Sequence, residues 1–103
     1  MSTKVHIPKE RLSAFCRRNR IRRLALFGSV LRADFAPGSD VDVLVEFEPN
    51  ADHSLFDLVH MQEELASMLG RKVDLIERTG LRNPFRRSEI LRTQQVIFDA
   101  RTA

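Results

Sequence analysis

The sequence predicts a single α/β domain that spans residues 1–103. Helix-like and strand-like segments alternate along the chain, and no internal repeat, linker or low-complexity segment divides it. At 103 residues with 43% hydrophobic content, the chain can bury one small core and has no room for a separate substrate domain. Helices and strands that alternate around one core are typical of the α/β class.

The first half of the chain predicts one helix and two strands, separated by turn residues. Proline is favoured in the first turn of a helix, so Pro8 opens a helix that is expected to end near Asn19. A short buried strand is expected over residues 24–27, and a strand of high β propensity over residues 41–47. Between them, the stretch SVLRAD predicts a short helical segment, after which a Pro-Gly pair breaks the chain.

The second half predicts two helices and two strands. Ser54 can cap a long helix because an acid stands three residues later, as in a capping box, and Gly70 supplies the C-terminal stop. An apolar stripe is expected on this helix, formed by Leu55, Leu58, Val59, Leu65, Ala66 and Leu69. A strand over residues 72–76, a helix opened by the Asn-Pro pair 83–84 and a short strand over residues 96–98 complete the fold.

Composition argues against several classes of protein. No apolar run approaches the length needed to span a bilayer, and the stretch MSTKVHIPKERLS lacks the apolar core of a secretory signal, so a cytoplasmic location is expected. Cys16 is the only cysteine, which excludes an intrachain disulfide, and it is interpreted as a small apolar helix residue. Because the chain has no Trp and no Tyr, direct nucleic-acid binding by aromatic stacking is not expected.

Basic residues outnumber acidic residues by 17 to 14, and the excess lies in two arginine groups. One is the stretch RRNRIRR at residues 17–23, and the other comprises Arg82, Arg86, Arg87 and Arg92. Clustered guanidinium groups suit a surface for phosphate or an acidic partner, but they also occur on plain solvated faces, and both interpretations stay open. The three histidines have no metal-ligand spacing and are expected in surface or capping roles.

Two aspartates stand at the start of the predicted strand 41–47. Side chains alternate along a strand, so Asp40 and Asp42 share one face while the valines between and after them point into the core. Neighbouring carboxylates repel each other unless a positive charge lies between them. Ligation by oxygen atoms alone favours a hard ion, and Mg²⁺ typically takes one or two carboxylates plus phosphate oxygens of a substrate.

A third aspartate interrupts the predicted strand 72–76. The neighbours of Asp74 point to the opposite face, so Asp74 completes a triad with Asp40 and Asp42 if the two strands are adjacent. Each aspartate alone is more simply explained as a surface charge on an edge strand. The three together favour a functional site.

The Gly28-Ser29 turn is suited to holding phosphate. A strand that ends in Gly-Ser before a short helix allows the backbone to approach a phosphate closely, with N–H groups and the serine hydroxyl as donors. Arg32 lies one turn further on and could add positive charge to the same site, although a surface role explains an isolated arginine equally well.

These residues carry a resemblance to a known family. Gly28-Ser29, ten intervening residues and then Asp40-x-Asp42 form the pattern G-S-x10-D-x-D, and with it the chain resembles the minimal nucleotidyltransferase family of the DNA polymerase β-like superfamily. Arg32 and Ser39 stand at positions that the family also uses. The resemblance covers nearly the full chain, and it implies a polymerase β-like nucleotidyltransferase fold, with a small mixed β-sheet and helices packed against it.

One departure from the family pattern is visible, since Ala33 stands where members commonly have glycine. The resemblance implies that Asp40 and Asp42 bind Mg²⁺ and that Asp74 completes the metal site or activates the acceptor hydroxyl. It also implies that Gly28, Ser29, Arg32 and Ser39 bind the nucleotide. The implied reaction is transfer of AMP from ATP to a hydroxyl, with release of pyrophosphate.

The resemblance also implies a partner. Family members of this length are often antitoxins of a HEPN-domain ribonuclease toxin, and some adenylylate a toxin tyrosine within a hetero-oligomer. Two alternatives stay open: an antitoxin that neutralises the toxin by binding alone, and a small-molecule nucleotidyltransferase, which ranks lowest because the larger relatives that modify antibiotics carry an additional domain. The intact Gly-Ser turn and aspartates favour activity, and the absence of Tyr means that a tyrosine acceptor must come in trans.

Overall fold

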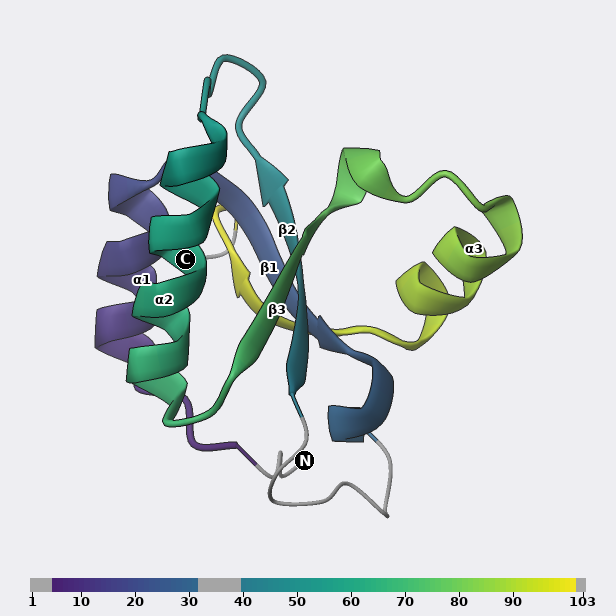
Figure 1. Ribbon diagram of the computed structural model, residues 1–103, viewed down its shortest axis with the longest axis horizontal. Helices are drawn as coiled ribbons and strands as arrows, with labels where there is room; N and C mark the ends of the chain where they lie inside the picture. The colour runs from purple at the N-terminus through teal and green to yellow at the C-terminus, as the bar shows by residue number, and fades with distance from the viewer. Residues whose placement is uncertain (1–4, 32–39, 102–103) are drawn as a thin grey trace.

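A four-stranded sheet with helices on both faces forms the centre of the molecule (Figure 1). The computed structural model describes residues 5–31 and 40–101. Its elements, in chain order, are α1 (Lys9–Arg18), β1 (Ile21–Phe27), the 3-10 helix η1 (Gly28–Leu31), β2 (Val41–Phe47), α2 (Leu55–Leu69), β3 (Val73–Glu77), the 3-10 helix η2 (Arg78–Gly80), α3 (Pro84–Thr93) and β4 (Gln95–Asp99). No helix in this described part of the chain is long and apolar enough to cross a membrane.

The sheet is mixed, as expected, with strand order β3-β2-β1-β4. β1 pairs antiparallel with both β2 and β4, whereas β2 and β3 are parallel. A parallel pair cannot be joined by a tight hairpin and needs a crossover connection, and α2 provides it. The acid-bearing strands β2 and β3 are therefore neighbours, which the sequence alone left undecided.

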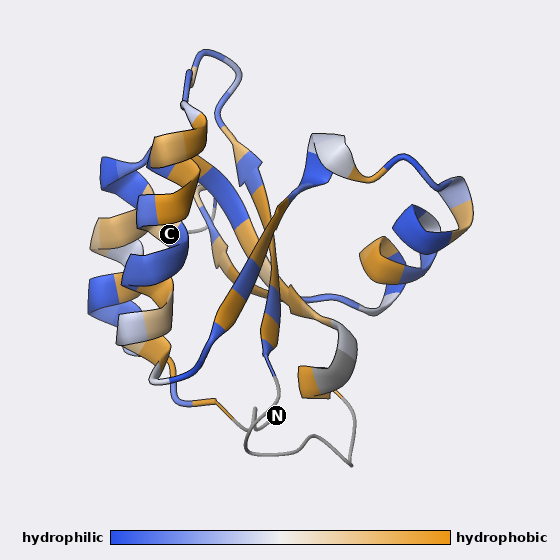
Figure 2. Cartoon of the chain, in the orientation of Figure 1, coloured by the Kyte–Doolittle hydropathy of each residue, from blue (hydrophilic) through white to orange (hydrophobic). Residues whose placement is uncertain are grey.

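The main core lies between the sheet and the helix pair α1 and α2 (Figure 1). Val41, Val43 and Val45 of β2 are fully buried in it, whereas the residues between them point to the other face. The alternation of hydrophobic and hydrophilic residues along the strands is visible in Figure 2. Cys16 of α1 is also buried in this core, and burial raises the pKa of its thiol to about 12, which confirms its interpretation as a small apolar residue.

A second and much smaller core lies on the opposite face, beneath α3. It consists of Phe27, Leu44, Leu81 and Ile90, with Ile76 and Leu91 packed against it. On β2, Leu44 alternates with the valines of the main core, so one strand supplies both layers. The even-numbered positions of β2 and β3 therefore face α3.

Helix α2 begins and ends where the sequence predicts. The Asp57 N–H donates to Ser54 Oγ (3.1 Å) and the Ser54 N–H donates to Asp57 Oδ2 (2.8 Å), which forms the expected capping box. Gly70 ends the helix in the left-handed region, with φ of 68°.

The predicted apolar stripe of α2 is wrong in part. Leu55 and Val59 are 76% and 46% exposed, whereas Met61 and Met68 are buried beside Leu65. At 100° per residue, Val59 lies about 120° around the helix from Leu65 and cannot share its contact with the sheet. Leu55 is the first residue of the helix, at its N-terminal end.

Strand β1 begins at Ile21, three residues earlier than predicted, and includes two arginines that a strand pattern does not favour. Their charges are matched across the sheet: Arg23 is paired with Asp99 of β4 (Nε to Oδ2, 3.4 Å), and both Arg22 and Arg23 lie within 4 Å of the Glu46 carboxylate. The predicted helical segment after β1 is the 3-10 helix η1 over its first three residues, and the remainder falls outside the described part.

The outer edge of β3 donates a backbone hydrogen bond to a helix side chain. The backbone N–H of Leu75 donates to Gln62 Oε1 of α2 at 2.9 Å. This bond ties the crossover helix to the strand that it introduces.

Candidate active site

Two of the predicted aspartates lie side by side on neighbouring strands. Asp42 of β2 and Asp74 of β3 are direct partners in the parallel register, so their side chains leave the same face of the sheet from strands about 4.8 Å apart. This is the face that bears Leu44 and α3. Asp42 is half-buried and Asp74 is exposed. The adjacency on which the predicted site depends is therefore confirmed for this pair.

Asp40 directly precedes β2 and is exposed. The Val41 N–H donates to the Lys72 carbonyl at 2.8 Å, which fixes the chain entering β2 against the chain entering β3. Within the described ranges, no three side chains of His, Cys, Asp or Glu are grouped as ligands of one metal ion. The structure thus brings Asp42 and Asp74 together, and a three-aspartate metal site stays a prediction.

The carboxylates nevertheless fit a hard cation in residue type and in strand position. Two acids in register on one face, with a third at the entry to β2, supply oxygen ligands only. Such a donor set suits Mg²⁺ and leaves coordination positions for substrate oxygens.

Gly28 makes room for the Asp42 carboxylate. Its φ is +76°, in the left-handed region that side chains disfavour, and a Cβ atom at this position would lie 2.4 Å from Asp42 Oδ2. Because no real Cβ atom tolerates that distance, any side chain here would displace the carboxylate. The glycine of the predicted motif thus positions the aspartate of the same motif.

The remaining predicted site residues are only partly placed. Ser29 is the second residue of η1, directly after Gly28. Arg32 and Ser39 lie outside the described residues. Their predicted contacts with a nucleotide stay predictions.

A pocket of about 660 Å³ opens between the Gly28 turn, the start of β2 and α3. It is lined by Phe27, Gly28, Leu31, Asp42, Arg86, Glu89, Ile90 and Thr93. The sheet wall thus carries the Asp42 carboxylate, and the helix wall carries a guanidinium group. Its volume is in the range of small-molecule sites.

Sequence reasoning missed the contribution of α3 to this pocket. The sequence presents Arg86 only as one member of an arginine group, and it does not single out Glu89 or Thr93. The available signal was spacing: positions 86, 89, 90 and 93 recur on one face of a helix, and Ile90 marks that face as the one packed on the sheet. The sequence does not indicate that this face of α3 covers the start of β2.

Some charged side chains of α3 are paired with each other, whereas Arg86 is not. Glu89 forms an ion pair with Arg92, one turn further along the helix. Arg86 has no such pairing: among the described residues, its side chain makes no hydrogen bond or ion pair. The backbone N–H groups of Phe85 and Arg86 donate to Asn83 Oδ1 at 3.0 and 3.2 Å, which caps the helix as the sequence predicts.

Three of the five arginines in the first group are paired with acidic side chains, and the other two, Arg17 and Arg20, are exposed. Arg18 pairs with Glu64 of α2, whereas Arg22 and Arg23 lie on β1 beside Glu46. The fold explains these three paired arginines without a phosphate or partner, and both interpretations stay open for Arg17 and Arg20.

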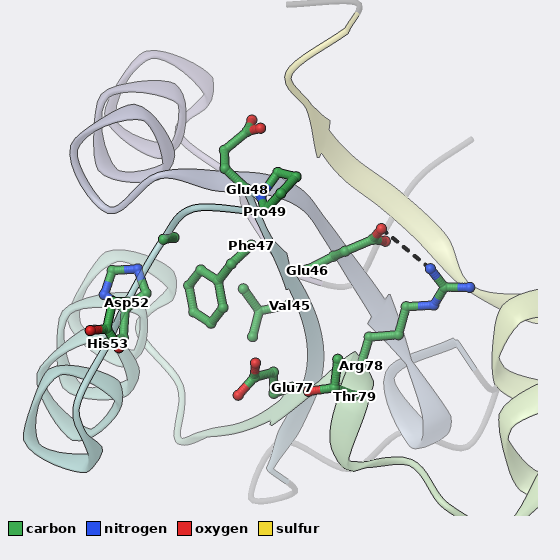
Figure 3. A pocket seen from close by; sticks show the side chains of 11 residues that line it. Val45, Glu46, Phe47, Glu48, Pro49, Asp52, His53, Glu77, Arg78 and Thr79 are labelled. Carbon is green, nitrogen blue, oxygen red and sulfur yellow. Dashed lines mark hydrogen bonds and ion pairs between the residues drawn. The ribbon is translucent and has the colours of Figure 1, made fainter.

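A second pocket, of about 440 Å³, lies at the far end of β2 (Figure 3). Three of its polar side chains, Glu46, His53 and Arg78, are engaged in contacts within the protein. Arg78 pairs with Glu46 at 3.3 Å, and His53 Nε2 lies 2.8 Å from the carbonyl oxygen of Asn19, to which it donates. The ring centroids of His53 and Phe47 are 4.4 Å apart. These contacts hold the loop after β2 against the end of α1, a capping role of the kind expected for a histidine.

Comparison with known proteins agrees with this geometry. A relative from Methanocaldococcus jannaschii, which carries the provisional name protein adenylyltransferase, is 37% identical over 69% of this chain and 71% of its own length. A solved structure described provisionally as a minimal nucleotidyltransferase is 34% identical, with a TM-score of 0.68 over 84% of this chain and 85% of its own.

Two further structures are similar in fold at 17% identity. One is a toxin-antitoxin complex with AMP-PNP (TM-score 0.70, covering 93% of this chain and 77% of that one). The other is the tri-AMPylated HEPN toxin of Shewanella oneidensis in complex with MNT antitoxin (TM-score 0.61, covering 91% and 71%).

The family assignment rests on the match over most of the chain, together with the paired aspartates beside the Gly28 turn. Residues 9–97 match the nucleotidyltransferase domain family, and this chain belongs to it.

Proposed function

We propose that this chain is a Mg²⁺-dependent protein adenylyltransferase, an antitoxin that transfers AMP from ATP to a tyrosine of a cognate HEPN-domain toxin in the cytoplasm. Residues 1–103 act as one minimal nucleotidyltransferase domain. The observation that carries the proposal is the in-register pair of Asp42 and Asp74 beside a pocket large enough for a nucleotide. The adenylyltransferase relative and the structural likeness to a complex of an AMPylated toxin support the acceptor class.

The nucleotide is bound at the Gly28 turn. Gly28 and Ser29 hold the triphosphate, with Arg32 and Ser39 as further ligands. Asp40 and Asp42 supply the metal ligands, and Asp74 either completes the metal site or acts as the base. Mg²⁺, when bound, neutralises phosphate charge and polarises the reacting phosphoryl group. The role of Gly28 is supported by the contact that it leaves open for the Asp42 carboxylate.

Asp74 is the candidate base for the acceptor hydroxyl. It is exposed at the start of the edge strand β3, directly beside Asp42, where a protein acceptor can approach from outside the sheet. An exposed carboxylate next to the nucleotide pocket can accept the proton of the attacking hydroxyl. Because this chain contains no Tyr, the tyrosine must be supplied by the toxin.

Asp42→Asn tests the proposal. This change removes one ligand charge at nearly constant volume, so we expect the fold to persist and AMP transfer to fall by on the order of a thousandfold. Intact-mass spectrometry of the HEPN-domain toxin, after incubation with this chain, ATP and Mg²⁺, measures the transfer. Asp52→Asn, at an exposed aspartate away from the pocket, is the matched control and should transfer AMP normally.

Two outcomes would contradict the proposal. Near-normal transfer by Asp42→Asn would remove Asp42 from the metal site. If the wild-type chain adds no nucleotide to the toxin but still binds it and inhibits its ribonuclease, the chain neutralises the toxin by binding alone.

A further inference from the structure

The helix wall of the nucleotide pocket carries Arg86, whose side chain forms no hydrogen bond or ion pair with the described part of the chain. Arg86 and Asp42 line the same pocket, Arg86 from α3 and Asp42 from β2. Of the pocket-lining residues that the structure describes, Arg86 is the one cation. Its neighbour on that wall, Glu89, is paired with Arg92 and so presents less negative charge to a bound anion.

The position of Arg86 on α3 is fixed by helix geometry and capping. Ile90, one turn later on the same face, is 6% exposed and packs against Phe27 and Leu44. Asn83, three residues before Arg86, caps the helix, and this fixes the first turn from which the guanidinium group projects. Arg86 therefore lies on the pocket side of α3, on the same helix face as Ile90, which attaches the helix to the sheet.

A nucleoside triphosphate needs a positive group at this wall. At neutral pH the triphosphate is highly anionic, and the sheet wall of the pocket presents the Asp42 carboxylate, which repels the triphosphate unless it binds a cation. A guanidinium group on the opposite wall can donate two parallel hydrogen bonds to phosphate oxygens.

We infer that Arg86 binds the β- and γ-phosphates of ATP, so that α3 forms one wall of the nucleotide site and selects a triphosphate over a monophosphate. This inference rests on the proposed function, and it places on α3 a specificity residue that lies outside the Gly-Ser and Asp-x-Asp motif. Arg87, the next residue on the helix, carries the same charge but does not line the pocket. The two arginines therefore provide a matched pair.

The test is equilibrium binding of ATP and of AMP to the full chain, each with Mg²⁺, measured by isothermal titration calorimetry. Arg86→Gln is expected to weaken ATP binding by roughly ten- to a hundredfold, the range of a lost charged hydrogen bond, and to leave AMP binding within about twofold. Arg86→Lys should restore part of the loss, because the charge returns without the bidentate geometry. Arg87→Gln should bind both nucleotides as the wild type does, and circular dichroism should show equal helix content in all variants.

The outcomes separate this inference from the proposed function. Unchanged ATP binding by Arg86→Gln would overturn it, as would equal losses for ATP and AMP, or an equal loss in Arg87→Gln. In each of those cases a wild-type chain that binds ATP and modifies the toxin leaves the proposed function standing. A wild-type chain that binds no ATP would overturn both.

Discussion

At the scale of single residues, the site depends on one close approach between the turn that follows β1 and the start of β2. Gly28 follows β1 with a positive φ, and its missing side chain leaves space for the Asp42 carboxylate. The motif therefore has a steric component in addition to its chemistry: the glycine is needed for the acid to stand where it does. The chain offers two other described glycines, Gly70 and Gly80, that separate the contributions to this effect.

Three alanine substitutions at these glycines should give a graded result. Gly80→Ala has open space and no positive φ, so we expect almost no change in the free energy of unfolding. Gly70→Ala has open space but a φ of +68°, and it should cost about 1 kcal/mol. Gly28→Ala adds the clash with Asp42 to the same backbone cost, so it should be the least stable of the three. It should also lose most of its AMP transfer.

Urea unfolding measures the free energy of unfolding of the three variants, and mass spectrometry of the toxin measures their AMP transfer. If Gly28→Ala were no less stable than Gly70→Ala and fully active, the contact with Asp42 would not constrain the site.

At the scale of secondary-structure elements, α2 is defined by its ends more than by its apolar pattern. The capping box of Ser54 and Asp57 and the left-handed Gly70 stand where local sequence predicts them, because each depends on residues within a few positions. The hydrogen bond that the Ser54 backbone donates is the main cause that lowers the pKa of Asp57.

The pKa of Asp57 predicts a pH dependence of stability. A carboxyl whose pKa is lowered by folding contributes stability above its ordinary value, here 3.8, and loses it as the pH falls through the lowered folded value. Asp57→Asn should therefore be less stable than the wild type at pH 7, and the difference should shrink as the solution is acidified below pH 3.8. Thermal unfolding at a series of pH values measures this. Asp52→Asn is the control, and a difference for Asp57→Asn that stayed constant down to low pH would contradict the assignment.

The sequence could predict the features that depend on residues near one another in the chain. It could not predict the features that depend on how distant elements pack together. The helix caps, the order of elements and the shared face of the acids on β2 and β3 follow from neighbouring residues and strand periodicity. The exposure of Leu55 and Val59, and the pocket role of Arg86, depend on which elements pack together, and chain periodicity does not encode that packing.

At the scale of the whole molecule, the two hydrophobic cores on the two faces of the sheet differ greatly in size. The main core joins α1 and α2 to the sheet through many fully buried side chains, whereas α3 is held through a cluster with four buried members. A helix attached by few buried contacts opens more readily than the body of the protein. The pocket proposed to bind the nucleotide lies under this weakly attached helix.

Amide hydrogen exchange should reveal this difference in attachment. We expect the amides of α3 to exchange faster than those of α2 in the free protein, because less apolar area must be exposed to release α3. Addition of ATP with Mg²⁺ should slow exchange in α3 selectively if Arg86 joins the helix to the nucleotide. Equal protection of α2 and α3 in the free protein would contradict the unequal attachment.

The hydrogen bond between Leu75 and Gln62 has a consequence for solubility. β3 is an edge strand, and the unpaired N–H and C=O groups of an edge can recruit a strand from another molecule. At the midpoint of this edge, Gln62 Oε1 occupies the N–H of Leu75, so an incoming strand would have to displace a helix side chain before it could pair. The side chain of the crossover helix thus obstructs intermolecular strand addition near Asp74, where the proposed function requires the edge to remain open to a reacting partner but closed to another copy of the sheet.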